Sequence, residues 1–160
     1  MERTVAICNV ILDIDMGNDI DDVLALAMLN NYHHLGCCKL PGIAISKDNE
    51  LSLIFTDVIN TFYGNTQIQI GIVENGFTPN ERTYLRPIIA ARYKKGERYT
   101  RSHSEYDDAV QMLRRALSKV DDKSVALIMI GFSTNIAKLL DSDADSSSSL
   151  NGMQLVEIRT

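Results

Sequence analysis

The sequence predicts an α/β fold, a Rossmann-like open and mainly parallel sheet with helices on both faces. Short apolar runs rich in β-branched residues alternate with helix-forming segments along the 160 residues. Such alternation implies parallel strands joined by helical crossovers. A cluster of aspartates follows the first run, at the sheet edge where ligands bind in such folds. The length and the 45% hydrophobic content predict one domain over residues 1–160.

The elements are predicted in this order. The apolar run at 5–14 is typical of a buried strand, and residues 22–31 form a helix that ends near the Asn30-Asn31 pair. The elements that follow are a strand at 40–46, a helix at 49–63, a strand at 67–73, a short helix at 84–93 within the irregular segment 74–104, a helix at 105–119, a strand at 124–130 and a helix from 133. Residues 141–150 are predicted to be a surface connection, and residues 151–160 to begin an element that the chain does not complete.

Helical periodicity predicts the core-facing side chains of two helices. Gly64 is expected to stop the helix at 49–63. The residues expected to face the core are Leu53, Val58, Ile59 and Phe62 in that helix, and Ala109, Met112, Leu113, Ala116 and Leu117 in the helix at 105–119.

Composition excludes several classes of function. A net charge of -5 without a basic stripe argues against binding to nucleic acid. No apolar stretch approaches the roughly 20 residues that cross a bilayer, so no membrane partner is expected. Cys8, Cys37 and Cys38 are odd in number and make a poor disulfide framework. Without a signal peptide in the sequence, we expect a cytoplasmic protein.

Five aspartates lie within ten residues after the first strand: Asp13, Asp15, Asp19, Asp21 and Asp22. Carboxylates this close oppose one another's ionisation unless a positive charge lies among them. Hard oxygen ligands without nearby His or Cys favour calcium or magnesium over zinc. The alternative is a solvated loop in which one aspartate caps the following helix.

The segment DIDMGNDIDDVLALAML resembles the amino-terminal signature of the inosine/uridine-preferring nucleoside hydrolases, D-x-D-P-G-x-D-D-A. Met16 replaces the proline, and two extra residues separate Gly17 from the Asp21-Asp22 pair. The longer spacing resembles a divergent, nucleoside hydrolase-like branch of that family, some of whose members are exported. GIAISKDN at 42–49 and GFSTNIAKLL at 131–140 match the same branch in the same order.

The resemblance implies a calcium-dependent ribonucleoside hydrolase, which splits the N-glycosidic bond to give ribose and free base. Asp15 corresponds to the metal ligand that also serves as general base, and Asp22 to the second metal-binding carboxylate. Thr134 corresponds to the residue that offers its backbone carbonyl to the calcium, with Asn135 bracing the same turn. The partner is a small-molecule nucleoside, whose base the sequence does not identify.

The same resemblance assigns the sugar contacts. Asp21 corresponds to the residue that hydrogen-bonds a ribose hydroxyl, and Asn49 to an amide that helps hold the sugar. Asp13 lies two residues before Asp15 and is expected on the same face of the strand, further from its carboxyl end. There it would orient the loop that follows the strand through hydrogen bonds. Asp19, in the inserted part of the motif, is interpreted as a helix cap, with an added metal ligand as the alternative. Asp48 is open to the same two interpretations, or is neutralised by its neighbour Lys47.

The family's remaining calcium carboxylate and its leaving-group histidine come from a carboxyl-terminal half that these 160 residues do not contain. The fold is therefore predicted to be truncated at the carboxyl end, as a piece of a longer hydrolase or as a shortened homologue with impaired catalysis. Self-association into a homo-oligomer would cover the exposed sheet edge.

Rival interpretations remain open. One is a non-catalytic calcium- and ribose-binding homologue. Another is a haloacid-dehalogenase-like phosphatase, because Asp13-Ile14-Asp15 resembles that family's acid pair, although Gly17 stands where the motif continues to Thr or Val. His33 and His34 are expected in an exposed turn after the first helix, and His103 is a weak candidate for a leaving-group acid.

Overall fold

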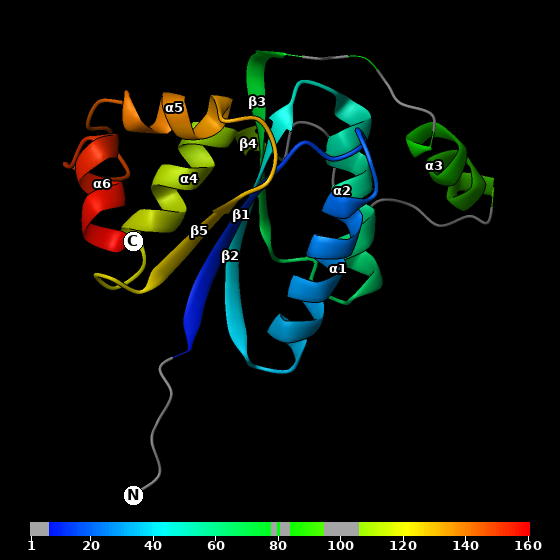
Figure 1. Ribbon diagram of the computed structural model, residues 1–160, viewed down its shortest axis with the longest axis horizontal. Coiled ribbons are helices and arrows are strands. Elements are labelled where there is room, and N and C mark those ends of the chain that lie inside the picture. Colours follow the sequence, from blue (N-terminus) through cyan, green and yellow to red (C-terminus); the bar gives the residue numbers. More distant parts are fainter. Residues whose placement is uncertain (1–6, 78–79, 81–83, 95–105) are drawn as a thin grey trace, which may run out of the picture.

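The computed structural model describes residues 7–77, 80, 84–94 and 106–160. It confirms the Rossmann-like α/β architecture, with a five-stranded, all-parallel open sheet in the order β4-β3-β2-β1-β5 (Figure 1). The strands are β1 (Cys8–Ile14), β2 (Cys38–Lys47), β3 (Gln69–Phe77), β4 (Asp107–Asp108) and β5 (Val125–Met129). The helices are α1 (Asp21–His34), α2 (Glu50–Phe62), α3 (Leu85–Lys94), α4 (Ala109–Ser118), α5 (Thr134–Leu140) and α6 (Gly152–Arg159).

The strand order creates a switch point between β1 and β5. From β1 the chain adds β2, β3 and β4 on one side, and then returns to place β5 on the other side of β1. The connections that follow β1 and β5 leave toward opposite faces, with α1 on one face and α5 on the other (Figure 1). In open parallel sheets, ligands bind in the crevice at such a point, beyond the carboxyl ends of the strands.

Helices cover both faces, as predicted, and each face has its own core. Neighbouring residues of β1 point to opposite sides, so Leu12 packs with α1 and α2 while Ile11 packs with α4, α5 and α6. The apolar stripe predicted for α4 is confirmed, since all five of its residues are buried in the second cluster.

The first helix is longer than predicted. It continues past the Asn30-Asn31 pair to His34, because Asn30 is buried and its amide donates to Leu26 O at 3.0 Å and to Asn60 Oδ1 of α2 at 2.9 Å. The helix stops where Gly36 adopts a φ of 72°. His33 and His34 therefore lie in the last turn of α1 and not in a turn after it.

The α2 helix has nearly the predicted bounds, and Gly64, with a φ of 77°, follows its end as expected. The assignment of Phe62 to the core is wrong, because this side chain is 70% exposed. Nine residues at 3.6 residues per turn place Phe62 on the side of the helix opposite Leu53.

Two further boundaries differ from the prediction. Asp107 and Asp108 pair with β3 as a short strand, and Asp108 accepts from the backbone N–H groups of Val110 and Gln111, so α4 begins only at Ala109. The strand predicted at 124–130 is shorter, since β5 spans Val125–Met129. It lies at the edge of the sheet, and Ile128 and Met129 are exposed.

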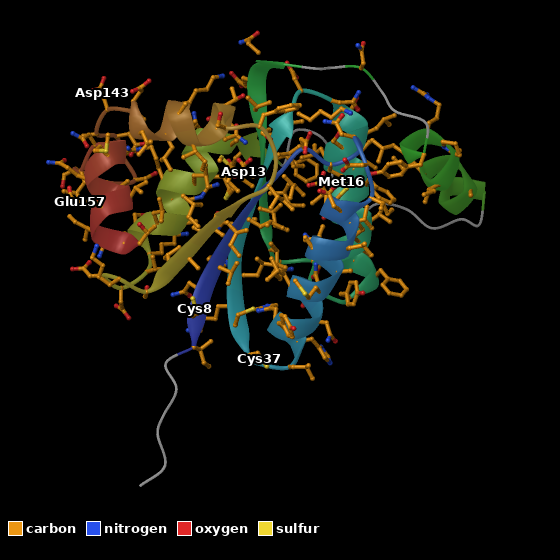
Figure 2. All side chains as sticks on the ribbon, in the orientation of Figure 1. Cys8, Asp13, Met16, Cys37, Asp143 and Glu157 are labelled. Carbon is orange, nitrogen blue, oxygen red and sulfur yellow. The ribbon has the colours of Figure 1, made fainter. Side chains whose placement is uncertain are left out.

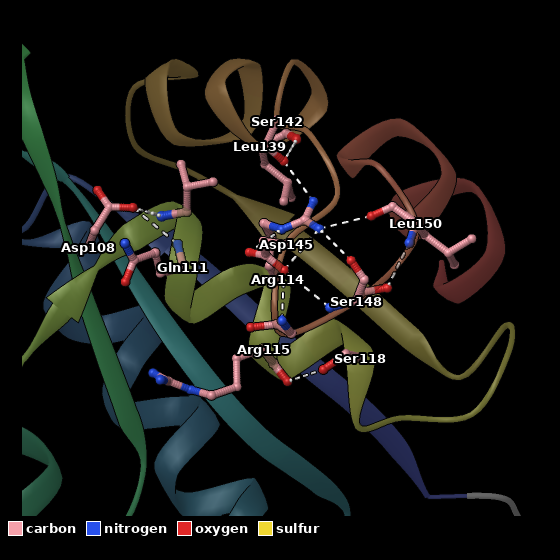
Figure 3. Close-up of polar contacts among 12 residues, drawn as sticks. Asp108, Gln111, Arg114, Arg115, Ser118, Leu139, Ser142, Asp145, Ser148 and Leu150 are labelled. Carbon is pink, nitrogen blue, oxygen red and sulfur yellow. Dashed lines mark hydrogen bonds and ion pairs between the residues drawn. The ribbon is translucent and has the colours of Figure 1, made fainter.

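The end of the chain is more ordered than predicted. Residues 141–150 are a surface connection, but the buried Arg114 of α4 binds Asp145 through two hydrogen bonds, of 2.8 and 3.2 Å (Figure 3). At 151–160, where the beginning of an element is predicted, the structure has α6, which starts with a capping box between Asn151 and Gln154.

Two negative findings concern the described part of the chain. No helix in it has the length and apolar character needed to span a bilayer. Cys8, Cys37 and Cys38 are all free.

Candidate functional site

The candidate site is the loop between β1 and α1, residues 15–20, together with the first turn of α1; we call it the acidic loop. Asp13 and Met16 lie near the carboxyl end of β1, whereas Cys8 and Cys37 lie at the opposite end of the sheet (Figure 2). The loop therefore occupies the ligand-binding edge at the switch point.

A glycine and the start of α3 fix the course of the acidic loop. Gly17 has a φ of 109°, and a Cβ added there would lie 2.5 Å from Leu85 Cδ1. The Tyr84 hydroxyl donates to Asp19 O at 2.5 Å. Tyr84 and Leu85, from the irregular segment 74–104, therefore contact the acidic loop. The hydrophobic periodicity of the sequence could not predict these two contacts.

Asp13 is fully buried beneath the loop. Its Oδ2 accepts from Asn135 Nδ2 at 2.8 Å, while Oδ1 has no hydrogen-bond partner among the described residues. Burial raises the pKa of Asp13 to about 7, and the Asn135 hydrogen bond partly opposes this rise. The interior position of Asp13 agrees with the prediction. The contact of Asn135 is with Asp13 of β1, whereas its expected bracing of the turn at Thr134 stays a prediction.

The strand ends are joined closely at this point. The Ser46 hydroxyl of β2 donates to Ile14 O at 3.0 Å and accepts from Phe132 N at 2.9 Å. A Cβ added to Gly131 would lie 2.4 Å from Ser46 Oγ, so only glycine allows this approach. Ser46 therefore links β1, β2 and the segment after β5, a role that the sequence analysis missed.

Asp22 is the most unusual carboxylate of the site. Its side chain is fully buried, and neither of its oxygens has a hydrogen-bond partner among the described residues. Burial raises its pKa to about 7, the negative charges of Asp15, Asp21 and Asp19 add to the effect in that order, and the nearby backbone N–H of Asp15 opposes it. A buried carboxylate left without a partner is costly, and a cation would relieve that cost.

Asp19, Asp21 and Asp22 form a group in which one oxygen from each lies within 4.8 Å of the others. Asp21 Oδ1 also accepts from Asp22 N at 2.9 Å. A hydrogen bond between the two exposed carboxyl groups raises the pKa of Asp19 and lowers that of Asp21. The interpretation of Asp19 as the helix cap is wrong, because the N-cap is Ile20 and no side chain caps it.

Asp15 is held by a chain of polar contacts outside that three-carboxylate group. Asn18 Nδ2 donates to Asp15 Oδ2, and Lys47 Nζ donates to Asn18 Oδ1 at 3.0 Å. Lys47 is buried and is the last residue of β2. Its positive charge therefore lies at the same edge of the sheet as the acidic loop. Asp48 Oδ2 accepts from Gly76 N at 3.0 Å, and the expected pairing of Lys47 with Asp48 stays a prediction.

Lys47 and Asn18 are functional candidates that sequence reasoning missed. The sequence did contain one indication of Lys47. This residue follows an apolar run that is predicted to end at the same edge of the sheet as the strand before Asp15. Its contact with Asn18 brings together residues 29 positions apart in the chain, to which the family signature gives no guide.

The other assigned residues lie on the same edge of the sheet. Asn49 is the N-cap of α2, and its Oδ1 accepts from Leu51 N at 2.9 Å. Thr134 is the first residue of α5, beside the buried Asn135. The structure thus groups Asp22 with Asp19 and Asp21, and it leaves the metal role of Asp15 and Thr134 as a prediction. His103 lies outside the described residues.

Comparison with models of known protein families found no match, and comparison with curated proteins found none either. A function can therefore be inferred from the geometry of the acidic loop and from the three motif segments.

Proposed function

We propose that this chain binds calcium at the acidic loop and hydrolyses the N-glycosidic bond of ribonucleosides to ribose and free base. The observation that carries the proposal is Asp22, whose two buried oxygens lack hydrogen-bond partners among the described residues while other carboxylates crowd around it. A site that concentrates negative charge in a buried position is what a divalent cation requires.

The donor set suits a hard cation. Asp19, Asp21 and Asp22 offer carboxylate oxygens within 4.8 Å of one another, and Asp15 contributes charge close enough to raise the pKa of Asp22. With the Thr134 carbonyl, these residues supply oxygen ligands, the type that calcium prefers. Bound at this site, calcium would supply Lewis acidity that lowers the pKa of a water molecule.

Side chains of this chain would transfer the proton and bind the sugar. In our proposal, Asp15 takes the proton of the attacking water, and Asn18 holds its carboxylate in one orientation. Asp21 and Asn49 contact the sugar hydroxyls. Because Asn49 Oδ1 already caps α2, its contact with the sugar would use the amide nitrogen as donor.

A neighbouring cavity supports an uncharged substrate. It has a volume of about 490 Å³ and lies at the carboxyl ends of β3 and β4. Its lining includes Asp48 and Glu50, which flank Asn49 in the chain. Its acidic lining would repel a phosphate, so we expect nucleosides to be preferred over nucleotides. The lining residues are Asp48, Glu50, Ile72, Val73, Glu74, Asn75, Tyr106, Asp107 and Asp108.

The environment of Asp13 disfavours the phosphatase alternative. In that alternative Asp13 would be the nucleophile, which must be ionised and open to substrate. Asp13 is fully buried, is bound to Asn135, and has a pKa raised to about 7. These properties suit a residue that positions the loop.

The test is release of base from inosine, uridine and a p-nitrophenyl riboside in calcium, with Asp15→Ala measured alongside. We expect turnover that depends on calcium and is lost in the variant. Turnover that Asp15→Ala leaves unchanged would contradict the catalytic assignment. Binding of calcium and ribose without release of base would favour the non-catalytic homologue.

A further inference from the structure

The three cysteines of the chain lie at the amino end of the sheet, away from the acidic loop. Cys8 is the first residue of β1, and Cys38, the first residue of β2, directly follows Cys37. Cys8 and Cys37 lie at the same end of the fold, opposite the end that holds Asp13 (Figure 2). Strand pairing therefore brings together cysteines that the sequence keeps far apart.

Cys8 and Cys38 are direct neighbours across two parallel strands. They are partners in the register of β1 with β2, so their Cα atoms are separated by the spacing of adjacent strands, about 4.8 Å. A disulfide usually joins Cα atoms that are roughly 4.4–6.8 Å apart. The backbone positions of the two residues therefore allow a disulfide without a shift of either strand.

The two side chains also lie on the same face of the sheet. Cys38 belongs to the core that packs against α1 and α2, and this core contains Val10 and Leu12 of β1. Because side chains alternate along a strand, Cys8 points to the same side as Val10 and Leu12. Cys37 precedes β2 and has no partner in β1. The pair that the fold aligns is therefore Cys8 with Cys38.

Cys8 is the accessible member of this pair. It is exposed, and its thiol donates a weak hydrogen bond to Asn9 O at 3.4 Å, so rotation about its Cα–Cβ bond can turn Sγ toward Cys38. Cys38 is 8% exposed, and burial raises the pKa of its thiol, an effect to which Cys37 and Cys8 add. Since the thiolate is the reactive form, an oxidant reacts with Cys8 before Cys38.

We propose that Cys8 and Cys38 are a peroxide-sensitive thiol pair that oxidation converts to a disulfide. The Cys8 thiolate attacks one oxygen of a hydroperoxide and becomes a sulfenic acid; the O–O bond breaks, and the departing oxygen takes up the proton that the Cys8 thiol released. The Cys38 sulfur then attacks the Cys8 sulfur. The S–O bond breaks, and the hydroxyl leaves as water with the Cys38 proton. Two thiols thus lose two electrons, which reduce one peroxide.

The disulfide would close a loop that contains the candidate site. Residues 9–37 lie between the two cysteines and include the acidic loop and the whole of α1. Closing this loop restricts the unfolded chain and should stabilise the folded one. In a reducing compartment the bond would be transient, as redox-sensing disulfides are. The inference does not depend on the proposed function.

The test treats the folded full chain with a small excess of hydrogen peroxide, then denatures it and alkylates the remaining thiols. Mass spectrometry of the intact protein counts the alkylated thiols. An aspartate-specific protease, cutting before Asp13 and Asp22, then separates Cys8 from the other two cysteines, so fragments that stay linked without reductant locate the bond.

The variants distinguish this bond from the other pairings. Cys8→Ser removes the accessible partner, and Cys37→Ser is its matched control, because Cys37 is also exposed. Circular dichroism checks that both fold. Cys38→Ser removes the second partner and should likewise form no link between the fragments.

We expect alkylation to fall from three thiols in reduced wild type to one after oxidation, with the two fragments linked until dithiothreitol is added. Cys37→Ser should form the same link and keep no free thiol, whereas Cys8→Ser should keep both of its thiols. Two results would overturn the inference. One is the absence of the link in oxidised Cys37→Ser, and the other is a loss of both thiols in Cys8→Ser, which would assign the disulfide to Cys37 and Cys38.

Discussion

Asn135 donates to the buried carboxylate of Asp13 at 2.8 Å and so ties the start of α5 to the end of β1. This hydrogen bond crosses the switch point of the sheet, between two strands whose connections leave on opposite faces. It fixes the two chain segments that border the acidic loop.

Replacing Asn135 with alanine should lower the free energy of unfolding by about 1–3 kcal/mol, since both oxygens of Asp13 would then be buried without a donor. Urea denaturation measures the change. Asn31→Ala, at an exposed position of α1, is the control and should alter stability by no more than about 0.5 kcal/mol. Equal effects of the two substitutions would contradict the bracing role.

Gly17 and Gly36 both have positive φ values, of 109° and 72°, but only Gly17 is enclosed. A Cβ at Gly17 would meet Leu85 at 2.5 Å, whereas a Cβ at Gly36 would meet nothing within 4 Å. Gly36→Ala should cost about 1 kcal/mol of backbone strain, and Gly17→Ala about 2 kcal/mol or more. Only Gly17→Ala should also weaken calcium binding, as measured by calorimetry. A Gly17→Ala protein with unchanged calcium affinity would show that the loop geometry is not required.

Arg114 lowers the pKa of Asp145, chiefly through their hydrogen bonds. A carboxyl group whose pKa is lower in the folded state contributes stability above its unfolded pKa, and this contribution is lost as the pH falls through the folded value. Asp145→Asn should therefore cost about 1 kcal/mol at pH 7, since the carboxyl is partly exposed.

At low pH, where Asp145 is protonated in wild type as well, the difference between the two proteins should nearly vanish. Urea titrations at both pH values measure it, with Asp143→Asn as the control because Asp143 is exposed on the same connection. A loss of stability that does not change with pH would contradict the ionic origin of the effect.

The contact between Asn18 and Asp15 leads to a prediction about activity. Removing the donor in Asn18→Ala should lower kcat about tenfold or more with little change in KM, because a misplaced base slows the reaction rather than binding. Asn18→Asp keeps an acceptor for Lys47 but gives Asp15 a carboxylate neighbour, so it should be at least as damaging. Full activity in Asn18→Asp would contradict the orienting role.

Local patterns predicted most of the fold because strand and helix periods were clear. The buried face of α4 and the stop at Gly64 followed from the sequence alone. The end of α1 did not, because Asn30, a weak helix former, is held in place by Asn60 from α2. Phe62 was assigned to the apolar stripe of α2, but it lies nine residues after Leu53 and therefore on the opposite, exposed side of the helix.

The sequence predicted where the site lies, but it did not predict most of the contacts within the site. Charge repulsion along the sequence identified the aspartates at the end of β1 without any tertiary information. Lys47 and Tyr84 reach the loop from β2 and from the start of α3, and such contacts exist only in the folded chain. Sequence reasoning therefore identified the acids but not the groups that orient them.

Titration calorimetry with calcium decides whether the acidic loop is a metal site, using wild type, Asp22→Asn and the control Asp143→Asn. We expect one calcium site in wild type and in the control, and a loss of affinity of about a hundredfold or more in Asp22→Asn, because a charged ligand is replaced by a neutral amide. Wild type that binds no calcium, or Asp22→Asn that binds as tightly as wild type, would contradict the account.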